Sequence, residues 1–225
     1  MIEPMSDTDL RARRHAALGD PIRLAVVEEL LRSDRSPSEL GTRFGLPSNL
    51  LAHHLAVLVE AGLIHRNPSS GDRRRRYVRA DHAVAAGLGL RPAEEPTGQM
   101  LFVCTHNSAR SQLAAALWRR ATGGDAASAG THPAARVRVG AVAAARRAGL
   151  DLGDARPRDL RDVAVGDRRV VTVCDRAHEE LDVGATWWHW SIPDPVEADT
   201  DKAYDRAVEL ITDRISIMTG GRPWN

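Results

Sequence analysis

The sequence is poor in cysteine and has no long apolar run. Its 225 residues contain two cysteines, Cys104 and Cys174. They are too few for a disulfide framework, which favours a reducing, cytoplasmic environment. No run approaches the roughly 18 apolar residues that a membrane-spanning helix needs, so we expect no membrane partner. The first residues are acidic and then basic without an apolar stretch, and no signal peptide is predicted.

The remaining composition is typical of a folded protein with one or two domains. Apolar residues make up 43% and charged residues 27%, which excludes wholesale disorder. The formal net charge of +1 hides a division, because residues 10–80 hold 13 arginines against 7 acidic residues, a balance of +6. Residues 96–225 hold 17 basic and 17 acidic residues. This division predicts a polyanionic partner for the first part only.

Residues 87–98 (GLGLRPAEEPTG) have the glycine and proline content of a linker. We therefore expect two domains, one from residues 6–90 and one from residues 99–225. The first is predicted to be a mainly α winged helix-turn-helix. Helices should start at Asp20-Pro21, Ser36-Pro37 and Pro47-Ser48, and the pattern of residues 63–66 and 76–79 predicts a β-hairpin with a longer loop.

The helices on either side of Gly45-Leu46-Pro47 predict a DNA-binding helix-turn-helix. The second helix would enter the major groove with its N-terminal residues foremost, and arginines at the hairpin tip would reach phosphates or a minor groove. The expected DNA contacts are Ser48, Asn49, His53 and His54 on the helix, and Arg73, Arg74, Arg75 and Arg76 on the hairpin.

This segment resembles the ArsR/SmtB family of repressors over about residues 8–88. The resemblance rests on Leu18-Gly19-Asp20-Pro21-Ile22-Arg23 and on the run from Leu55 to Ile64. It implies a homodimer on a double-stranded DNA operator. Arsenite-sensing members commonly carry cysteines near the helix that corresponds to residues 36–44, whereas residues 1–99 contain none. Because arsenic(III) prefers several thiolates, we expect no metal or metalloid site in this domain.

The second segment alternates strands with helices. This order predicts an α/β domain with a central parallel sheet flanked by helices. The expected strands are residues 100–103, 169–173 and 187–192, and the expected helices are residues 111–121, 137–148 and 200–218.

The most informative motif begins where the first of these strands ends. It reads Cys104-Thr105-His106-Asn107-Ser108-Ala109-Arg110-Ser111 and leads directly into a helix. The backbone N–H groups of such a loop form an anion site at the helix N-terminus, and Arg110 can hold two oxyanion oxygens. This setting favours a thiolate at Cys104 that attacks phosphorus or arsenic in line, while Ser111 can hydrogen-bond the thiolate. The plainer interpretation is a small buried cysteine at the end of a strand.

This loop, the later Ser128–Thr131 and Asp194-Pro195 together resemble the low-molecular-weight tyrosine phosphatase fold over about residues 99–219. Residues 107–112 and 171–175 point to its arsenate reductase branch. The resemblance implies that Cys104 is the nucleophile, Arg110 the oxyanion clamp, Asp194 the general acid and Cys174 the second cysteine that displaces arsenite.

Departures from the family pattern affect how the enzyme would be reduced. Thioredoxin-dependent reductases carry a third cysteine seven positions after the second, and this chain has Leu181 there. A glutamate of a potassium-binding subset corresponds to Ala115, and His106 replaces a common glycine. We expect no bound cofactor. A small external thiol such as mycothiol or glutathione, with a glutaredoxin-like protein, is favoured over thioredoxin as the reductant.

The sequence therefore predicts a bifunctional ArsR-type regulator and arsenate reductase in arsenic resistance. One alternative is a protein-tyrosine or small phosphate-ester phosphatase joined to a repressor. Cys174 argues against it, as does the lack of an aromatic residue directly after Asp194-Pro195. The other alternative is a repressor whose second domain senses an oxyanion without turning it over.

Overall fold

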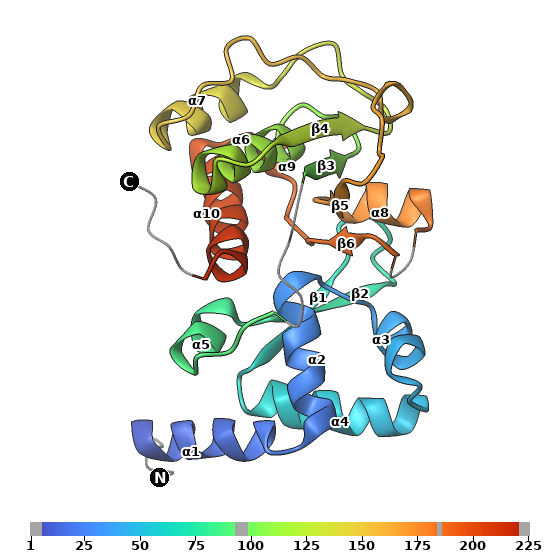
Figure 1. Cartoon of the computed structure of the whole chain (residues 1–225), viewed down its shortest axis with the longest axis vertical. Helices are drawn as coiled ribbons and strands as arrows, with labels where there is room; N and C mark the ends of the chain where they lie inside the picture. Colours follow the sequence, from blue (N-terminus) through green and yellow to red (C-terminus); the bar gives the residue numbers. More distant parts are fainter. Residues whose placement is uncertain (1–5, 93–98, 184–185, 221–225) are drawn as a thin grey trace.

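The computed structural model describes residues 6–92, 99–183 and 186–220. They form two lobes stacked along the long axis of the molecule (Figure 1). The first lobe consists of α1 (Asp7–Leu18), α2 (Pro21–Arg32), α3 (Pro37–Phe44), α4 (Ser48–Glu60), β1 (Ile64–Pro68), β2 (Arg76–Ala80) and α5 (His82–Gly87). The second consists of β3 (Met100–Cys104), α6 (Arg110–Thr122), β4 (Ala126–Gly130), α7 (Val139–Arg147), η1 (Leu160–Asp162), β5 (Arg169–Thr172), α8 (Asp175–Leu181), β6 (Trp188–His189), α9 (Pro195–Ala198) and α10 (Asp201–Met218).

The helix-turn-helix of the first lobe is built by local signals. Asp20 caps α2 by accepting hydrogen bonds from two backbone N–H groups, and Ser36 and Glu39 form a reciprocal capping box on α3. Gly45 follows α3 as its C-cap with a φ of 62°, which glycine adopts without strain. The strands β1 and β2 then pair antiparallel as the predicted hairpin.

The second lobe contains the predicted parallel sheet, with strand order β4-β3-β5-β6. On one face, Phe102 packs with the apolar residues of α6 and α10. On the other face, Leu101 and Val103 pack with Val163 and, more peripherally, with Leu181 of α8. The β3 strand lies inside the sheet, so the loop that follows it opens at the carboxyl edge.

Some elements differ from the sequence-based expectation. The helix α1 and the strand β4 were not predicted, and β4 (AASAG) contains no β-branched residue that would mark a strand. The strand expected over residues 187–192 is limited to β6. Residues 93–98 of the expected linker and the last five residues of the expected second domain lie outside the described residues.

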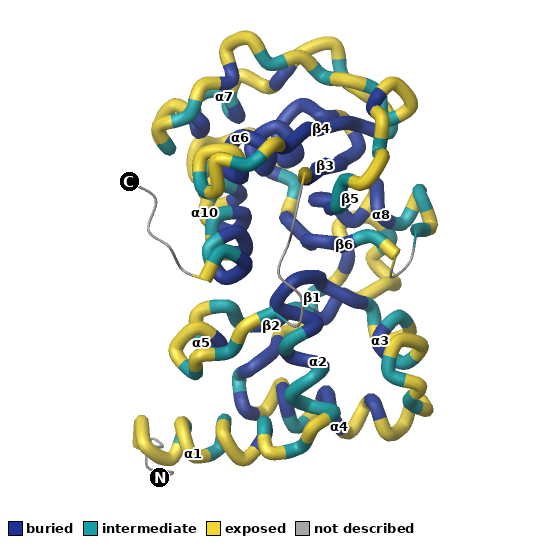
Figure 2. Tube along the Cα trace, in the orientation of Figure 1, coloured by how far each residue is buried: buried dark blue, intermediate teal, exposed yellow. Residues whose placement is uncertain are grey.

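The two lobes are joined by a buried interface around residues 33–35. The backbone N–H of Asp34 donates to the carbonyl of His189 at 2.7 Å, and the indole Nε1 of Trp190 donates to the carbonyl of Arg32 at 2.9 Å. The next residue, Arg35, pairs through its backbone with Val78 of β2 in the first lobe. The buried tube segments of Figure 2 run from one lobe into the other at this point, so the lobes share one core. Among the described helices, none is long and apolar enough to cross a bilayer.

Candidate functional site

The loop between β3 and α6 surrounds the sulfur of Cys104 with polar groups. The backbone N–H of Asn107 donates to Cys104 Sγ at 3.2 Å, and the hydroxyl of Ser111 lies 3.0 Å from the same sulfur. Because Cys104 ends a strand and Arg110 begins a helix, the loop is fixed at both ends. A thiolate at this position would be stabilised by both hydrogen bonds.

The side chain of Asn107 supports the loop through hydrogen bonds. Its backbone has a φ of 46°, in the left-handed region that asparagine tolerates better than most residues. Its Nδ2 donates to Ser111 Oγ at 2.8 Å, and its Oδ1 accepts from the backbone N–H of Arg158 at 2.8 Å. Opposite the loop, a Cβ at Gly130 would lie 2.8 Å from the carbonyl oxygen of Thr105, so only glycine fits there. The Asn107 side chain therefore supports the loop, while its N–H serves the predicted cradle.

Arg110 and Asp194 are paired beside this loop. Arg110 Nη2 donates to Asp194 Oδ2 at 2.6 Å, and Nη1 donates to the carbonyl of Ile192 at 3.0 Å. Although burial works against the charge, the sulfurs of Cys174 and Cys104 and the carboxylate of Asp194 raise the pKa of Arg110 above its ordinary value. The guanidinium is thus a fixed cation next to the thiol.

Cys174 adjoins the same loop from a different strand. It follows β5 and caps α8, with its sulfur 3.4 Å from the backbone N–H of Ala177 and 3.3 Å from the hydroxyl of Thr105. Burial raises the pKa of the Cys174 thiol, with a further rise from Cys104 that Arg110 opposes. Both cysteines are free thiols. Cys104 begins the loop, and Cys174 contacts Thr105, the next residue of the loop.

A small pocket of about 60 Å³ adjoins the loop, and Cys104 itself is buried and does not line it. The residues that line it are Ser70, Thr105, His106, Arg110, Arg176, Asp194 and Glu197. Four of them were predicted from the sequence, whereas Ser70, Arg176 and Glu197 were missed. Arg176 and Glu197 each follow a predicted residue by two or three positions. Nothing in the sequence links Ser70, in the hairpin of the first lobe, to this pocket.

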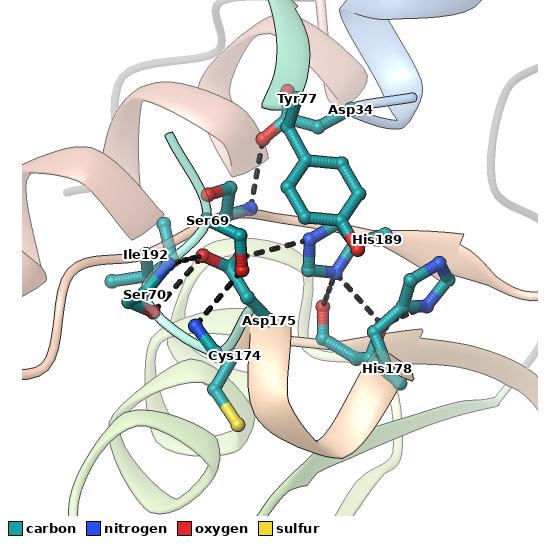
Figure 3. Close-up of polar contacts among 12 residues, drawn as sticks. Asp34, Ser69, Ser70, Tyr77, Cys174, Asp175, His178, His189 and Ile192 are labelled. Atoms are coloured by element: carbon teal, nitrogen blue, oxygen red, sulfur yellow. Dashed lines mark hydrogen bonds and ion pairs between the residues drawn. The ribbon is translucent and has the colours of Figure 1, made fainter. Parts of the chain in front are cut away.

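Asp175, in α8 of the second lobe, is hydrogen-bonded to Ser70 in the hairpin of the first lobe (Figure 3). Its Oδ2 accepts hydrogen bonds from the backbone N–H of Ser70 at 2.7 Å and from the Ser70 hydroxyl at 2.9 Å. Its Oδ1 lies 3.1 Å from Nε2 of the buried His189. Although burial favours the neutral carboxyl, the hydrogen bonds and charge of these partners lower the pKa of Asp175 to about 2. The carboxylate is therefore a fixed acceptor for the hairpin.

The expected DNA contacts divide into exposed and buried side chains. Ser48, Asn49 and His53 are exposed near the start of α4, and the arginines of residues 73–76 are exposed on the hairpin. The expectation for His54 is wrong, because only 5% of this residue is exposed. Its Nδ1 lies 3.9 Å from the carboxylate of Asp20, so the side chain faces the core of the first lobe instead of DNA.

Metal ligation finds no support in the parts of the chain that the structure describes. Within residues 6–92, 99–183 and 186–220, no three His, Cys, Asp or Glu side chains gather as a metal ion would require.

Two family models match the chain. The model of the low molecular weight phosphotyrosine protein phosphatases covers residues 99–219, and a helix-turn-helix domain model covers residues 18–67. No curated protein matches the sequence.

Similar solved structures include reductases and phosphatases. An arsenate reductase from Archaeoglobus fulgidus is 30% identical, with 54% of this chain and 98% of that chain covered and a TM-score of 0.45. A thioredoxin-dependent arsenate reductase from Corynebacterium glutamicum is 26% identical, with 63% and 68% covered and a TM-score of 0.44. The tyrosine phosphatase Wzb from Escherichia coli K30, in complex with sulphate, is 21% identical, with 52% and 93% covered and a TM-score of 0.46.

Proposed function

The chain belongs to the low molecular weight phosphotyrosine protein phosphatase family and carries a helix-turn-helix domain ahead of the family's fold, and from this we propose that it is an arsenate reductase joined to an ArsR-type transcriptional regulator. The proposal places the protein in arsenic resistance, with arsenate as substrate and arsenite as product. The regulator would act as a homodimer on an operator in double-stranded DNA.

The observation that carries the proposal is the second thiol at the anion loop. A phosphatase needs one nucleophile and water, whereas reduction of arsenate needs two electrons, which a pair of thiols supplies by becoming a disulfide. Cys174 lies 3.3 Å from the hydroxyl of Thr105, the residue that directly follows Cys104. The second thiol of the reaction is then either Cys174 or a small external thiol that reaches the same adduct, and Cys174→Ser distinguishes the two.

The size of the pocket also favours an inorganic oxyanion. A volume of about 60 Å³ is far below the roughly 300 Å³ from which pockets for drug-sized ligands begin. A tetrahedral oxyanion needs little room beyond the loop and the guanidinium, whereas a phosphotyrosine side chain also brings an aromatic ring. The pocket as it stands suits arsenate better than an aryl phosphate.

In the proposed reaction, the Cys104 thiolate attacks arsenic(V), and one oxygen leaves as water after it receives a proton. Asp194 lines the pocket and would supply this proton, while Arg110 would hold the remaining oxygens. A second thiol then attacks the sulfur of the Cys104–arsenic adduct. The sulfur–arsenic bond breaks with its electron pair on arsenic, which leaves as arsenite. The resulting disulfide is reduced by an external thiol, and two thiols are oxidised for each arsenate reduced.

The regulatory part of the proposal rests on the basic hairpin and the exposed N-terminal end of α4. Ser48 and Asn49 could reach base edges in a major groove, and the arginines of residues 73–76 could bind phosphates.

One assay separates the proposed activity from its alternatives. The full chain is incubated with arsenate and glutathione, mycothiol or thioredoxin, and arsenite is measured; hydrolysis of p-nitrophenyl phosphate is measured in parallel. We expect arsenite formation that is lost in Cys104→Ser. Hydrolysis without arsenite formation would indicate a phosphatase. Absence of both, with retained phosphate binding, would indicate a non-catalytic oxyanion sensor.

A further inference from the structure

The loop between β1 and β2 is bonded to the catalytic lobe. We call residues 69–72 the wing loop. The Ser69 hydroxyl donates to Glu179 Oε1 at 2.6 Å, and the backbone N–H of Asp72 donates to Glu179 Oε2 at 2.8 Å. Ser70 is bonded to Asp175, as Figure 3 shows. Both carboxylates belong to α8, so one helix of the catalytic lobe holds the whole wing loop.

The wing loop also lies in direct contact with α8. A Cβ placed on Gly71 would collide with the carboxylate of Glu179 and would come within 3.1 Å of the backbone of Arg176. Ser69 is only 2% exposed despite its place in a surface hairpin. This close approach positions Ser70 at the pocket that contains Arg110 and Asp194.

We propose that the wing loop forms the outer wall of the oxyanion pocket, and that Ser70 in this wall limits the ligand to small inorganic oxyanions. The proposal rests on the proposed function, since it assumes that the pocket binds an oxyanion. In an in-line displacement the leaving group departs on the side opposite the attacking sulfur. Thr105, His106 and Arg110 belong to the anion cradle, so the outer wall consists of Ser70, Arg176, Asp194 and Glu197. A leaving oxygen fits inside this wall, whereas the alcohol of an ester must extend through it.

The anchor of the wing loop can be removed without changing the pocket lining. Glu179 accepts hydrogen bonds from Ser69, Asp72 and the hydroxyl of Tyr77, but it does not line the pocket. Its neighbour Glu180 is exposed and contacts Thr131 and His132 instead of the wing loop. Glu179→Ala therefore removes the hydrogen bonds to Ser69 and Asp72 and leaves the wing loop held only through Ser70 and Asp175. Glu180→Ala is the matched control on the same helix. Gly71→Ala displaces the wing loop by a different route.

The test measures ligand size without relying on turnover. Iodoacetamide alkylation of Cys104 in the full chain is followed by mass spectrometry of its peptide, with inorganic phosphate or phenylphosphonate as the protecting ligand. In the unchanged protein and in Glu180→Ala, phosphate should protect at a concentration about tenfold lower than phenylphosphonate does. In Glu179→Ala and Gly71→Ala, phenylphosphonate protection should improve about tenfold while phosphate protection stays within about twofold.

The outcomes distinguish this inference from the proposed function. Equal protection by the two ligands in the unchanged protein, or no gain for phenylphosphonate in either wing-loop variant, would overturn the inference while arsenite formation could persist. Failure of phosphate to protect the unchanged protein would overturn the oxyanion pocket and with it both proposals. A third outcome is that the wing-loop variants lose the size discrimination and the unchanged protein forms no arsenite. This result would support the inference and contradict the proposed arsenate reductase activity.

Discussion

Nη2 of Arg214, in α10, donates to both carboxylate oxygens of Asp34 at 2.7 and 2.6 Å. Asp34 follows α2 and lies in the interface between the lobes. Both side chains are almost completely buried, and the backbone N–H of Ser191 donates to the same carboxylate at 2.8 Å. The ion pair connects the DNA-binding lobe to the last helix of the catalytic lobe. Loss of Arg214 leaves the buried Asp34 carboxylate with the Ser191 N–H but without the charge of the guanidinium.

Arg214→Met should lower the free energy of unfolding by about 3–5 kcal/mol, because it strands the Asp34 carboxylate in the interface. Urea unfolding followed by tryptophan fluorescence measures the loss. Asp34→Leu combined with Arg214→Met should recover part of it, since no buried charge remains. Arg206→Ala, on the exposed side of the same helix, is the control and should cost about 0–1 kcal/mol. A loss below about 1 kcal/mol in Arg214→Met would contradict the assignment.

Arg110→Lys should reduce kcat/KM for arsenate by about 10²–10³-fold. A lysine ammonium cannot match a planar fork that bonds Ile192 and Asp194 with separate nitrogens. Steady-state arsenite formation gives the measurement. Arg120→Lys changes an exposed arginine of the same helix and should retain activity. Comparable losses in both variants would point to a general effect on α6.

Cys174→Ser should retain most of the activity when a small thiol is supplied. Burial raises the pKa of the Cys174 thiol, which slows its attack on an adduct at Cys104, and no third cysteine exists to carry a disulfide outward. Arsenite formation with glutathione or mycothiol tests this. The opposite result is a variant that stops after one adduct per subunit. A disulfide between the peptides of Cys104 and Cys174, seen as a loss of about 2 Da, would then identify the internal route.

Replacement of the four arginines at residues 73–76 by alanine should weaken binding to all DNA duplexes and reduce the salt dependence of the affinity. These exposed guanidinium groups are suited to phosphates, and each phosphate contact contributes about one unit to the salt slope. Asn49→Ala should instead alter sequence preference. Binding is measured by fluorescence anisotropy at several salt concentrations. An affinity that barely depends on salt in the unchanged protein would contradict this prediction.

Asp175→Asn should make stability less sensitive to acid. The folded-state pKa of Asp175 is about 2, below its ordinary value of 3.8, so its contribution is present above pH 4 and is lost as the pH falls toward 2. This pKa shift corresponds to about 2 kcal/mol of stability, and the burial of Asp175 keeps solvent from screening it. Urea unfolding between pH 7 and pH 3 should therefore show the two proteins converging at low pH. A gap that stays constant with pH would contradict the shift.

The helix-turn-helix and the anion loop could be predicted because their signals are local. Capping residues set the ends of α2 and α3, and Cys104 and Arg110 are fixed by a strand and a helix that flank them. The burial of His54 could also be predicted, because His54 shares one helical face with Leu51, Leu55 and Leu58. All four residues are buried. The position of Ser70 at the pocket could not be predicted from the sequence. It depends on hydrogen bonds between residues more than 100 positions apart, which arise only when the lobes pack.

The bonds between the wing loop and α8 have a thermodynamic consequence for the proposed regulator. The arginines that follow the wing loop in the same hairpin face solvent, so a DNA duplex that shifts the hairpin also shifts Ser70 at the oxyanion pocket. Coupling between two binding equilibria is reciprocal, and each ligand changes the affinity of the other by the same factor. Under that coupling the operator is an effector of the enzyme as much as arsenate is an effector of the repressor.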